Sequence, residues 1–393
     1  MCSRWAARVT LSVEAILLSQ GSKWKFNLLN FHYQFMSFLE KSFKWDQAPF
    51  QLYTRLGNSG LKISRVILGC MSFGKKSWSD YVVEDEEQVF EIMKKAYDSG
   101  IRTFDTAGNY SNGYSEILVG KFLKKYNIDR RTIVILTKCY FPVSEEPGAD
   151  PSNGSEEGVD FINRVGLSRK AIFDAVDKSV ERLGTYIDLL QIHRYDRTTP
   201  AEETMEALHD VVKSGKALYI GASSMRAYQF IRLQNIAERH GWTKFVSMQS
   251  YYSLLYRDEE DELIAYCHET GVGLIPWSPL AAGVLARPAV KAHDTTVRSS
   301  NSSFLSYLGL AELTENDIEV INRVEALAAK HKVSMATVAT AWILAKGQYP
   351  ILGINKPERL GDALAAISLK LSEEEVHYLE EAYGVRKLPA LYH

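Results

Sequence analysis

The chain has 393 residues, in which 46 Lys and Arg nearly balance 48 Asp and Glu, for a formal net charge of −2. With this balance the chain has no overall positive electrostatic field that would attract nucleic acid or an anionic membrane, so we expect neither as a partner. The four cysteines, at positions 2, 70, 139 and 267, show no metal-ligand spacing, which favours a reducing, cytoplasmic location without a metal site. The oligomeric state is not predicted.

Residues 1–51 precede the first strand pattern and form an N-terminal extension. Its apolar run Val13–Leu18 is interrupted by Glu14 and preceded by Arg4 and Arg8, so it is too short and too charged to span a bilayer. A mitochondrial presequence, a segment docked through its Leu and Phe stripe, a disordered tail and an unusual start of the coding sequence remain alternatives.

From residue 52 to the C-terminus, short apolar strands alternate with amphipathic helices, the signature of βαβ units. A hairpin around Asn58-Ser59-Gly60 comes first and is expected to plug the barrel bottom. We predict an α/β fold, a (β/α)8 TIM barrel spanning residues 52–393. The expected strands are Val66–Gly69, Arg102–Asp105, Ile133–Lys138, Leu189–His193, Ala217–Gly221, Val246–Gln249, Gly273–Trp277 and Ile351–Gly353.

Helices are expected between these strands, several with recognisable ends. Thr199-Pro200-Ala201-Glu202 is typical of a capping box, and Ser334 is expected to cap the helix that Gly347 ends. The expected helices are Glu86–Ser99, Ser115–Tyr126, Ser168–Leu183, Pro200–Ser214, Ala227–Arg239, Glu260–Thr270, Glu315–Lys330, Met335–Lys346 and Pro357–Ala365.

Two long segments without periodicity, Pro142–Gly166 and Arg287–Tyr307, follow predicted strands. Their place after strands puts them on the face where barrel chemistry occurs. We favour loops that shape a substrate site over a merely disordered surface.

Four side chains at or just after predicted strand ends suggest carbonyl chemistry. They are Asp105, Tyr110, Lys138 and His193. Reducing a carbonyl needs a proton donor, and a Lys138 cation would lower the pKa of Tyr110 so that the phenol is a better acid. Asp105 would hold the lysine, and His193 would orient the carbonyl oxygen.

Each of these residues also has a purely structural interpretation. Asp105 could be a turn residue, Lys138 an ordinary strand-end cation and His193 a hydrogen-bonded histidine near the core. Their joint placement at successive strand ends is what favours a common site, because those ends converge in a barrel. Cys139, next to Lys138, points the other way by strand alternation and is expected to pack.

Together with this set, a series of motifs resembles the aldo/keto reductase family from about Tyr53 to Leu371. The motifs are Leu68-Gly69-Cys70-Met71-Ser72-Phe73-Gly74, the run from Asp105 to Glu116, Gly221-Ala222-Ser223-Ser224, Met248-Gln249-Ser250-Tyr251-Tyr252, Pro276-Trp277-Ser278-Pro279-Leu280 and Gly353-Ile354-Asn355-Lys356-Pro357-Glu358. Within the family the chain is similar to fungal enzymes resembling aryl-alcohol dehydrogenases and versiconal hemiacetal acetate reductase.

The resemblance implies NADP as cofactor and assigns it a set of binding residues. Ser223 and Gln249 would bond the nicotinamide carboxamide, and Trp277 would stack on the ring. Ser278, Leu280 and Gly283 would wrap the pyrophosphate. Gly353, Asn355, Lys356 and Arg359 would meet the adenosine side, where the two cations favour a 2′-phosphate; the alternative for them is a solvated surface.

The chain departs from the family pattern at four positions. Ser224 and Ser250 stand where many relatives have Asn, Ala282 replaces a frequent Arg, and Ala363 replaces an Asn that usually contacts adenine. These changes bear on cofactor affinity and leave the four catalytic candidates intact.

The substrate is expected to be a small carbonyl compound held by apolar and aromatic side chains. Such a pocket suits an aryl or polyketide-like aldehyde or ketone better than a sugar phosphate. The alternative function is a nucleotide-binding regulatory subunit of the same fold with little turnover. The residues expected to line the pocket are Met71, Phe73, Tyr140, Phe141, Tyr195 and Tyr252.

Overall fold

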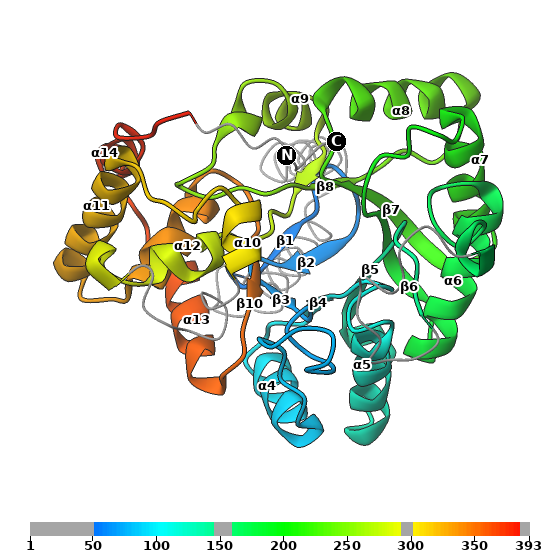
Figure 1. Ribbon diagram of the computed structural model, residues 1–393, viewed down its shortest axis with the longest axis horizontal. Helices are drawn as coiled ribbons and strands as arrows, with labels where there is room; N and C mark the ends of the chain where they lie inside the picture. Colours follow the sequence, from blue (N-terminus) through cyan, green and yellow to red (C-terminus); the bar gives the residue numbers. More distant parts are fainter. Residues whose placement is uncertain (1–50, 145–158, 292–301, 386–393) are drawn as a thin grey trace, which may run out of the picture. The chain divides into compact units, whose positions relative to one another are not determined.

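The computed structural model describes residues 51–144, 159–291 and 302–385. Residues 1–50 of the N-terminal extension and the middle of both long loops lie outside these residues. Eight parallel strands form the central sheet in the order β10-β3-β4-β5-β6-β7-β8-β9, with helices around it (Figure 1). They are β3 (Ile67–Gly69), β4 (Thr103–Asp105), β5 (Val134–Cys139), β6 (Ile187–Ile192), β7 (Ala217–Ser223), β8 (Ser247–Gln249), β9 (Gly273–Leu274) and β10 (Ile351–Gly353).

The two ends of this sheet are joined by main-chain hydrogen bonds. Tyr349 donates to the Leu274 carbonyl and Ile351 to the Pro276 carbonyl, each at 2.9 Å. On its other side, β10 pairs in parallel with β3. The curled sheet therefore closes, and the predicted TIM-barrel-like α/β fold is confirmed.

An antiparallel hairpin precedes the barrel, as predicted, and consists of β1 (Tyr53–Arg55) and β2 (Lys62–Ser64). Its Leu56 and Ile63 are fully buried in one cluster with strand residues such as Leu136 and Leu189. The turn lies against the start of β9, where a side chain on Gly57, which has φ of +56°, would collide with the Gly271 carbonyl at 2.2 Å. The hairpin thus covers one end of the apolar barrel interior.

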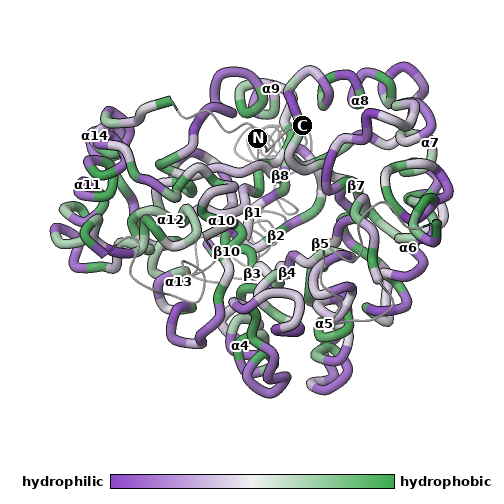
Figure 2. Tube along the Cα trace, viewed as in Figure 1, coloured by the Kyte–Doolittle hydropathy of each residue, from purple (hydrophilic) through white to green (hydrophobic). Residues whose placement is uncertain are grey.

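Helices surround the strands with apolar residues inward, and hydrophilic stretches follow the outer edge of α7 and α8 (Figure 2). Ser334 caps its helix as predicted, accepting a hydrogen bond from the Thr337 amide. The long helices are α4 (Glu86–Asp98), α5 (Tyr114–Lys125), α6 (Arg169–Leu183), α7 (Ala201–Lys213), α8 (Ala227–His240), α9 (Leu263–Thr270), α11 (Glu315–His331), α12 (Met335–Ala345), α13 (Leu360–Ser368) and α14 (Glu373–Glu380). None of the described helices is long and apolar enough to cross a membrane.

Three predictions of helix ends are wrong. No Thr199 capping box exists: Pro200 occupies the N-cap without a side-chain bond, because the Thr199 hydroxyl donates to Asp196 instead. Helix α9 begins at Leu263, after a short 3-10 turn, and α13 begins at Leu360 after another. The predictions missed α14, whose start is fixed by a capping box between Ser372 and Glu375.

A buried carboxylate anchors the loop between β4 and α5. Glu116 has no exposed side-chain surface and accepts hydrogen bonds from Thr137 Oγ1 at 2.5 Å and from Arg182 Nε at 2.6 Å. Arg182 also lies under Gly113, where a Cβ would stand 2.5 Å from its Cδ. This ion pair therefore ties β5, α5 and α6 together beneath the loop that carries Tyr110.

We expect Glu116→Ala to lower the free energy of unfolding by roughly 3–5 kcal/mol, because it leaves Arg182 half-buried without its partner. Chemical denaturation followed by circular dichroism measures this. The matched control is Glu181→Ala, which removes an exposed pair with Lys178 at 3.1 Å and is expected to cost less than about 1 kcal/mol. Equal losses in the two variants would contradict an anchoring role for Glu116.

Candidate active site

The four catalytic candidates converge at the carboxyl ends of neighbouring strands. Asp105 is the last residue of β4, Lys138 is the second-to-last residue of β5, and His193 directly follows β6. Tyr110 stands in the loop after β4 and is buried. Parallel register brings these groups together, since β4 pairs with β5 and β5 with β6.

Lys138 is the centre of this group. Its Nζ lies 2.6 Å from Asp105 Oδ2, 2.9 Å from the Thr106 carbonyl and 3.3 Å from the Tyr110 hydroxyl oxygen. An ammonium has three hydrogens, so each is donated to one of these acceptors. The Tyr110 oxygen accepts from the lysine, which leaves its own hydrogen free for another partner.

The net effect of the surroundings on Tyr110 is opposite to the prediction. Burial raises the pKa of Tyr110, Lys138 lowers it, and the negative charge of Asp105 raises it again. The upward effects win because the phenolate would lose its hydration inside the barrel. Tyr110 is therefore a protonated phenol at neutral pH, held against a cation.

His193 lies beside Tyr110, with 5.9 Å between the ring centroids, and 5.0 Å from the Phe141 ring. Burial, then the nearby Arg194 and Lys138 cations, lower the pKa of His193 well below its usual value. The imidazole is therefore neutral at pH 7 and has one N–H to donate. A neutral donor at this position can bond a carbonyl oxygen without carrying a charge.

Two glutamines complete the surroundings of Asp105, and Gln191 was not predicted. Gln191 Nε2 donates to Asp105 Oδ1 at 3.1 Å, and Gln249 Nε2 donates to the same oxygen at 3.0 Å and to Gln191 Oε1 at 2.9 Å. Sequence alternation could have identified Gln191, since it lies two residues before His193 on the same face of β6. The carboxylate is thus held from β5, β6 and β8 at once.

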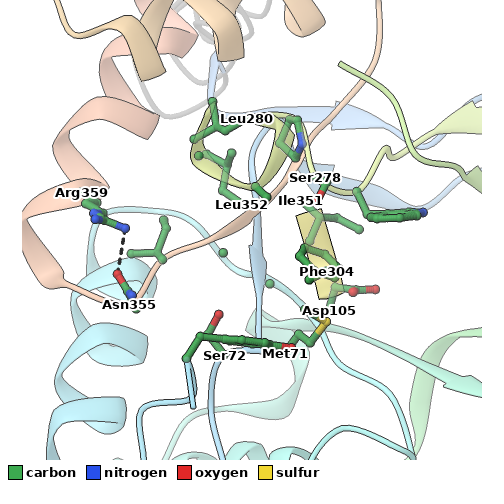
Figure 3. A pocket seen from close by; sticks show the side chains of 18 of the residues that line it. Met71, Ser72, Asp105, Ser278, Leu280, Phe304, Ile351, Leu352, Asn355 and Arg359 are labelled. Carbon is green, nitrogen blue, oxygen red and sulfur yellow. Dashed lines mark hydrogen bonds between the residues drawn. The ribbon is translucent and has the colours of Figure 1, made fainter. Parts of the chain in front are cut away.

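A cavity of about 700 Å³ opens over these groups, and all ten residues predicted to bind the cofactor line it. Figure 3 shows Ser278 and Leu280 at the top of the view, Asn355 and Arg359 at the left, and Asp105 at the right near Phe304 and Met71. The ten residues are Ser223, Gln249, Trp277, Ser278, Leu280, Gly283, Gly353, Asn355, Lys356 and Arg359.

Near the catalytic group, Trp277 presents a ring to the cavity. Its other face stacks on Tyr251, with 4.9 Å between centroids, and its Nε1 donates to Ser224 Oγ at 3.0 Å. Ser223 Oγ donates to the Gln249 carbonyl at 2.8 Å. These bonds fix the tryptophan and both serines before any ligand arrives.

At the far end of the cavity, Arg359 donates to Asn355 Oδ1 at 2.9 Å, and Lys356 is exposed. No carboxylate in the described residues pairs with either cation, although Asp362 also lines this end. Ala282 and Ala363, two of the departures from the family pattern, line the wall and offer no polar side-chain atom there.

The structure places the six residues predicted for the substrate pocket in different surroundings. Met71 and Phe141 line the cavity, but Phe73, Tyr140, Tyr195 and Tyr252 do not. Phe73 is fully buried in the core. Tyr252 stacks on Trp342 and its hydroxyl donates to Glu260, while Tyr140 and Tyr195 pack against the core. The aromatic wall comes instead from Trp78, Tyr81, Phe304 and Tyr307.

None of the described cysteines lines the cavity. Cys139 is buried, as expected from strand alternation, and burial raises the pKa of its thiol to about 12. No group of three His, Cys, Asp or Glu side chains among the described residues could hold a metal ion.

The structure therefore combines a TIM-barrel-like fold with an aspartate, a lysine, a tyrosine and a histidine gathered at one end of a cavity. The aldo/keto reductase family model matches residues 65–384, so the chain belongs to this family of oxidoreductases. Members of the family generally use NAD(P)H and act on small carbonyl substrates.

Curated relatives are similar over most of their length. The chain is 61% identical over 340 residues to a protein of Schizosaccharomyces pombe named as a putative aryl-alcohol dehydrogenase, covering 85% of this chain and 96% of that one. It is 55% identical over 335 residues to versiconal hemiacetal acetate reductase of Aspergillus parasiticus, covering 84% and 96%.

We expect the His193 imidazole to remain neutral from pH 8 down to pH 6, because burial and two cations oppose its protonation. NMR of histidine labelled with carbon-13 measures this, with the signal assigned by its loss in His193→Gln. Because the unfolded chain takes up this proton at about pH 6.5, His193 also lowers folding stability as the pH falls below that value. A titration midpoint at or above 6.5 would show that the imidazole is solvated.

Proposed function

We propose that the protein reduces an aldehyde or ketone to the alcohol with NADPH, using Tyr110 as the proton donor. The observation that carries this proposal is the Lys138 ammonium, which joins the Asp105 carboxylate to the Tyr110 hydroxyl at the inner end of the cavity. A structural role alone would not require a buried cation beside a phenol that faces a cavity.

Each of the four side chains has a separate role in the reduction of the carbonyl group. When bound, the reduced nicotinamide supplies a hydride to the carbonyl carbon. Neutral His193 donates a hydrogen bond that orients the oxygen, and Tyr110 transfers its proton to it. Lys138 stabilises the phenolate left behind, and Asp105 keeps the ammonium charged and in place.

The lining residues fit a nicotinamide cofactor. Trp277 offers an open ring face for stacking, and Gln249, whose two N–H groups are already donated, can accept a bond from a carboxamide NH₂ through its Oε1. Lys356 and Arg359, at the opposite end, favour NADP over NAD, because a 2′-phosphate would supply their missing counter-charge.

The substrate class follows from the walls near Tyr110. Trp78, Tyr81, Phe141, Phe304 and Tyr307 line the cavity and suit a flat aryl or polyketide-like carbonyl compound. The names of the relatives, an aryl-alcohol dehydrogenase and a hemiacetal acetate reductase, agree with this choice.

The second candidate is a regulatory subunit that binds the nucleotide with little turnover. The intact set of four residues favours the enzyme. Mixing purified protein with NADPH and a panel of aryl aldehydes, while following nicotinamide absorbance, separates the two: tight NADPH binding without oxidation would establish the regulatory alternative.

Tyr110→Phe is expected to lower kcat at least roughly 100-fold while the Kd for NADPH changes little, because only the donated proton is lost. Lys138→Met should lose activity comparably. Steady-state kinetics and NADPH fluorescence titration measure these effects. Retention of more than a tenth of wild-type kcat by Tyr110→Phe would remove Tyr110 as the acid.

Lys356→Ala is expected to weaken NADPH binding by about 1–3 kcal/mol and NADH binding much less, since only NADPH carries the 2′-phosphate. Dissociation constants for both coenzymes measure the difference. Lys370→Ala, an exposed lysine outside the cavity lining, is the control and should change neither constant. An equal weakening of both coenzymes would show that Lys356 does not contact the 2′-phosphate.

A further inference from the structure

Arg194 introduces a positive charge into the catalytic end of the cavity that the four catalytic candidates do not explain. It follows His193 at the end of β6, lines the cavity and is half-buried. Its Nη1 donates to the His193 carbonyl at 2.7 Å, and its Nη2 lies 3.4 Å from the Tyr307 hydroxyl. These two bonds hold the guanidinium in position, and its other N–H groups have no hydrogen-bond partner among the described residues.

No carboxylate in the described residues pairs with this guanidinium. Asp196, the acid nearest in sequence, accepts hydrogen bonds from Leu167, Thr198 and Thr199. Asp105, which also lines the cavity, is paired with Lys138. A partly buried cation is normally compensated by an anion, so the missing charge is expected to come from a ligand.

The cavity wall around Arg194 is aromatic, and this restricts the kind of anion that can bind there. The guanidinium carbon lies 5.6 Å from the Phe141 ring centroid, and the Tyr307 and Phe304 rings stack with 6.4 Å between centroids. Both rings line the same cavity. A planar, apolar body carrying one anionic oxygen would satisfy these walls and the cation together.

The cofactor phosphates have their own cations elsewhere. Lys356 and Arg359 follow β10, and three strands separate β10 from β6 in the sheet order, so the two cationic positions lie on opposite sides of the barrel. Arg194 instead lies next to His193 and close to Tyr110, where the carbonyl must bind. The positive charge of Arg194 therefore lies where it can contact the substrate and not the cofactor phosphates.

Building on the proposed reductase function, we propose that Arg194 selects carbonyl substrates that carry an anionic oxygen, a carboxylate or a phenolate, on an aromatic body. The guanidinium forms a charge-assisted hydrogen bond with that oxygen while Tyr110 and His193 engage the carbonyl. Arg194 is then a residue for specificity, whereas proton transfer stays with Tyr110.

The experiment compares para- and meta-carboxybenzaldehyde with their methyl esters, at saturating NADPH. Each pair has nearly the same size and differs in charge. The wild-type enzyme is expected to prefer at least one acid over its ester in kcat/KM. In Arg194→Met this preference should fall roughly 10- to 100-fold, mainly through KM. The ester serves as the internal reference for any general loss of activity.

Arg197→Met is the matched control, because Arg197 lies three residues further on the same loop, is exposed and does not line the cavity. It should keep the wild-type preference. Should Arg194→Met fail to fold, the wild-type enzyme alone gives a second measurement: added KCl should raise KM for the preferred acid but not for its ester.

Different results separate the possible failures. If the wild-type enzyme reduces the esters as well as both acids, or if Arg194→Met lowers kcat/KM equally for acid and ester, the selecting role of Arg194 is wrong. If Arg194→Met instead weakens NADPH binding, the guanidinium serves the cofactor and the proposal is likewise overturned. If the enzyme oxidises NADPH with none of these benzaldehydes, neither the acids nor the methyl esters, the proposed reductase function itself fails.

Discussion

The buried ion pair between Lys138 and Asp105 is the interaction on which the site depends. Placing an ammonium and a carboxylate inside a barrel costs several kcal/mol per ion in lost hydration, unless every donor and acceptor finds a partner. Here the lysine donates to Asp105, Thr106 and Tyr110, and the other oxygen of Asp105 accepts from Gln191 and Gln249. The pair is kept charged by this full set of bonds.

These partners come from four strands, so the ion pair and the closure of the barrel support each other. Lys138 opposes Gln191 in the register of β5 and β6, and one layer lower the apolar Leu136 opposes Leu189. The interior therefore changes within two residues from an apolar layer, closed by the hairpin, to a polar one beneath the cavity. A shift of register by one residue in β5 would turn Lys138 away from the site.

The barrel and the polar group were predictable because both depend on short-range patterns. Apolar strands ending in Asp105, Lys138 and His193 indicate the sheet and its active end. The wall near Tyr110 was not predictable in the same way. Phe304 and Tyr307 reach the cavity from α10 (Ser302–Tyr307), a short helix in a segment that we predicted as a loop because its sequence has no periodicity. Tyr252, which follows a strand end, is instead buried by stacking on Trp342. Which aromatic ring faces a cavity depends on tertiary packing that sequence spacing does not encode.

The pKa of Tyr110 is shifted upward, which changes the role that Lys138 has in proton transfer. A lysine beside a phenol suggests an acid made stronger by a charge, but burial and Asp105 outweigh that effect. The site therefore keeps the phenol protonated and places the compensating cation where the phenolate forms. The lysine has its largest effect after the proton has left, because the new negative charge lies 3.3 Å from an ammonium in a medium that screens it poorly. The arrangement thus stabilises charge as it develops on Tyr110, with little reorganisation because the ammonium is already fixed by its other two bonds.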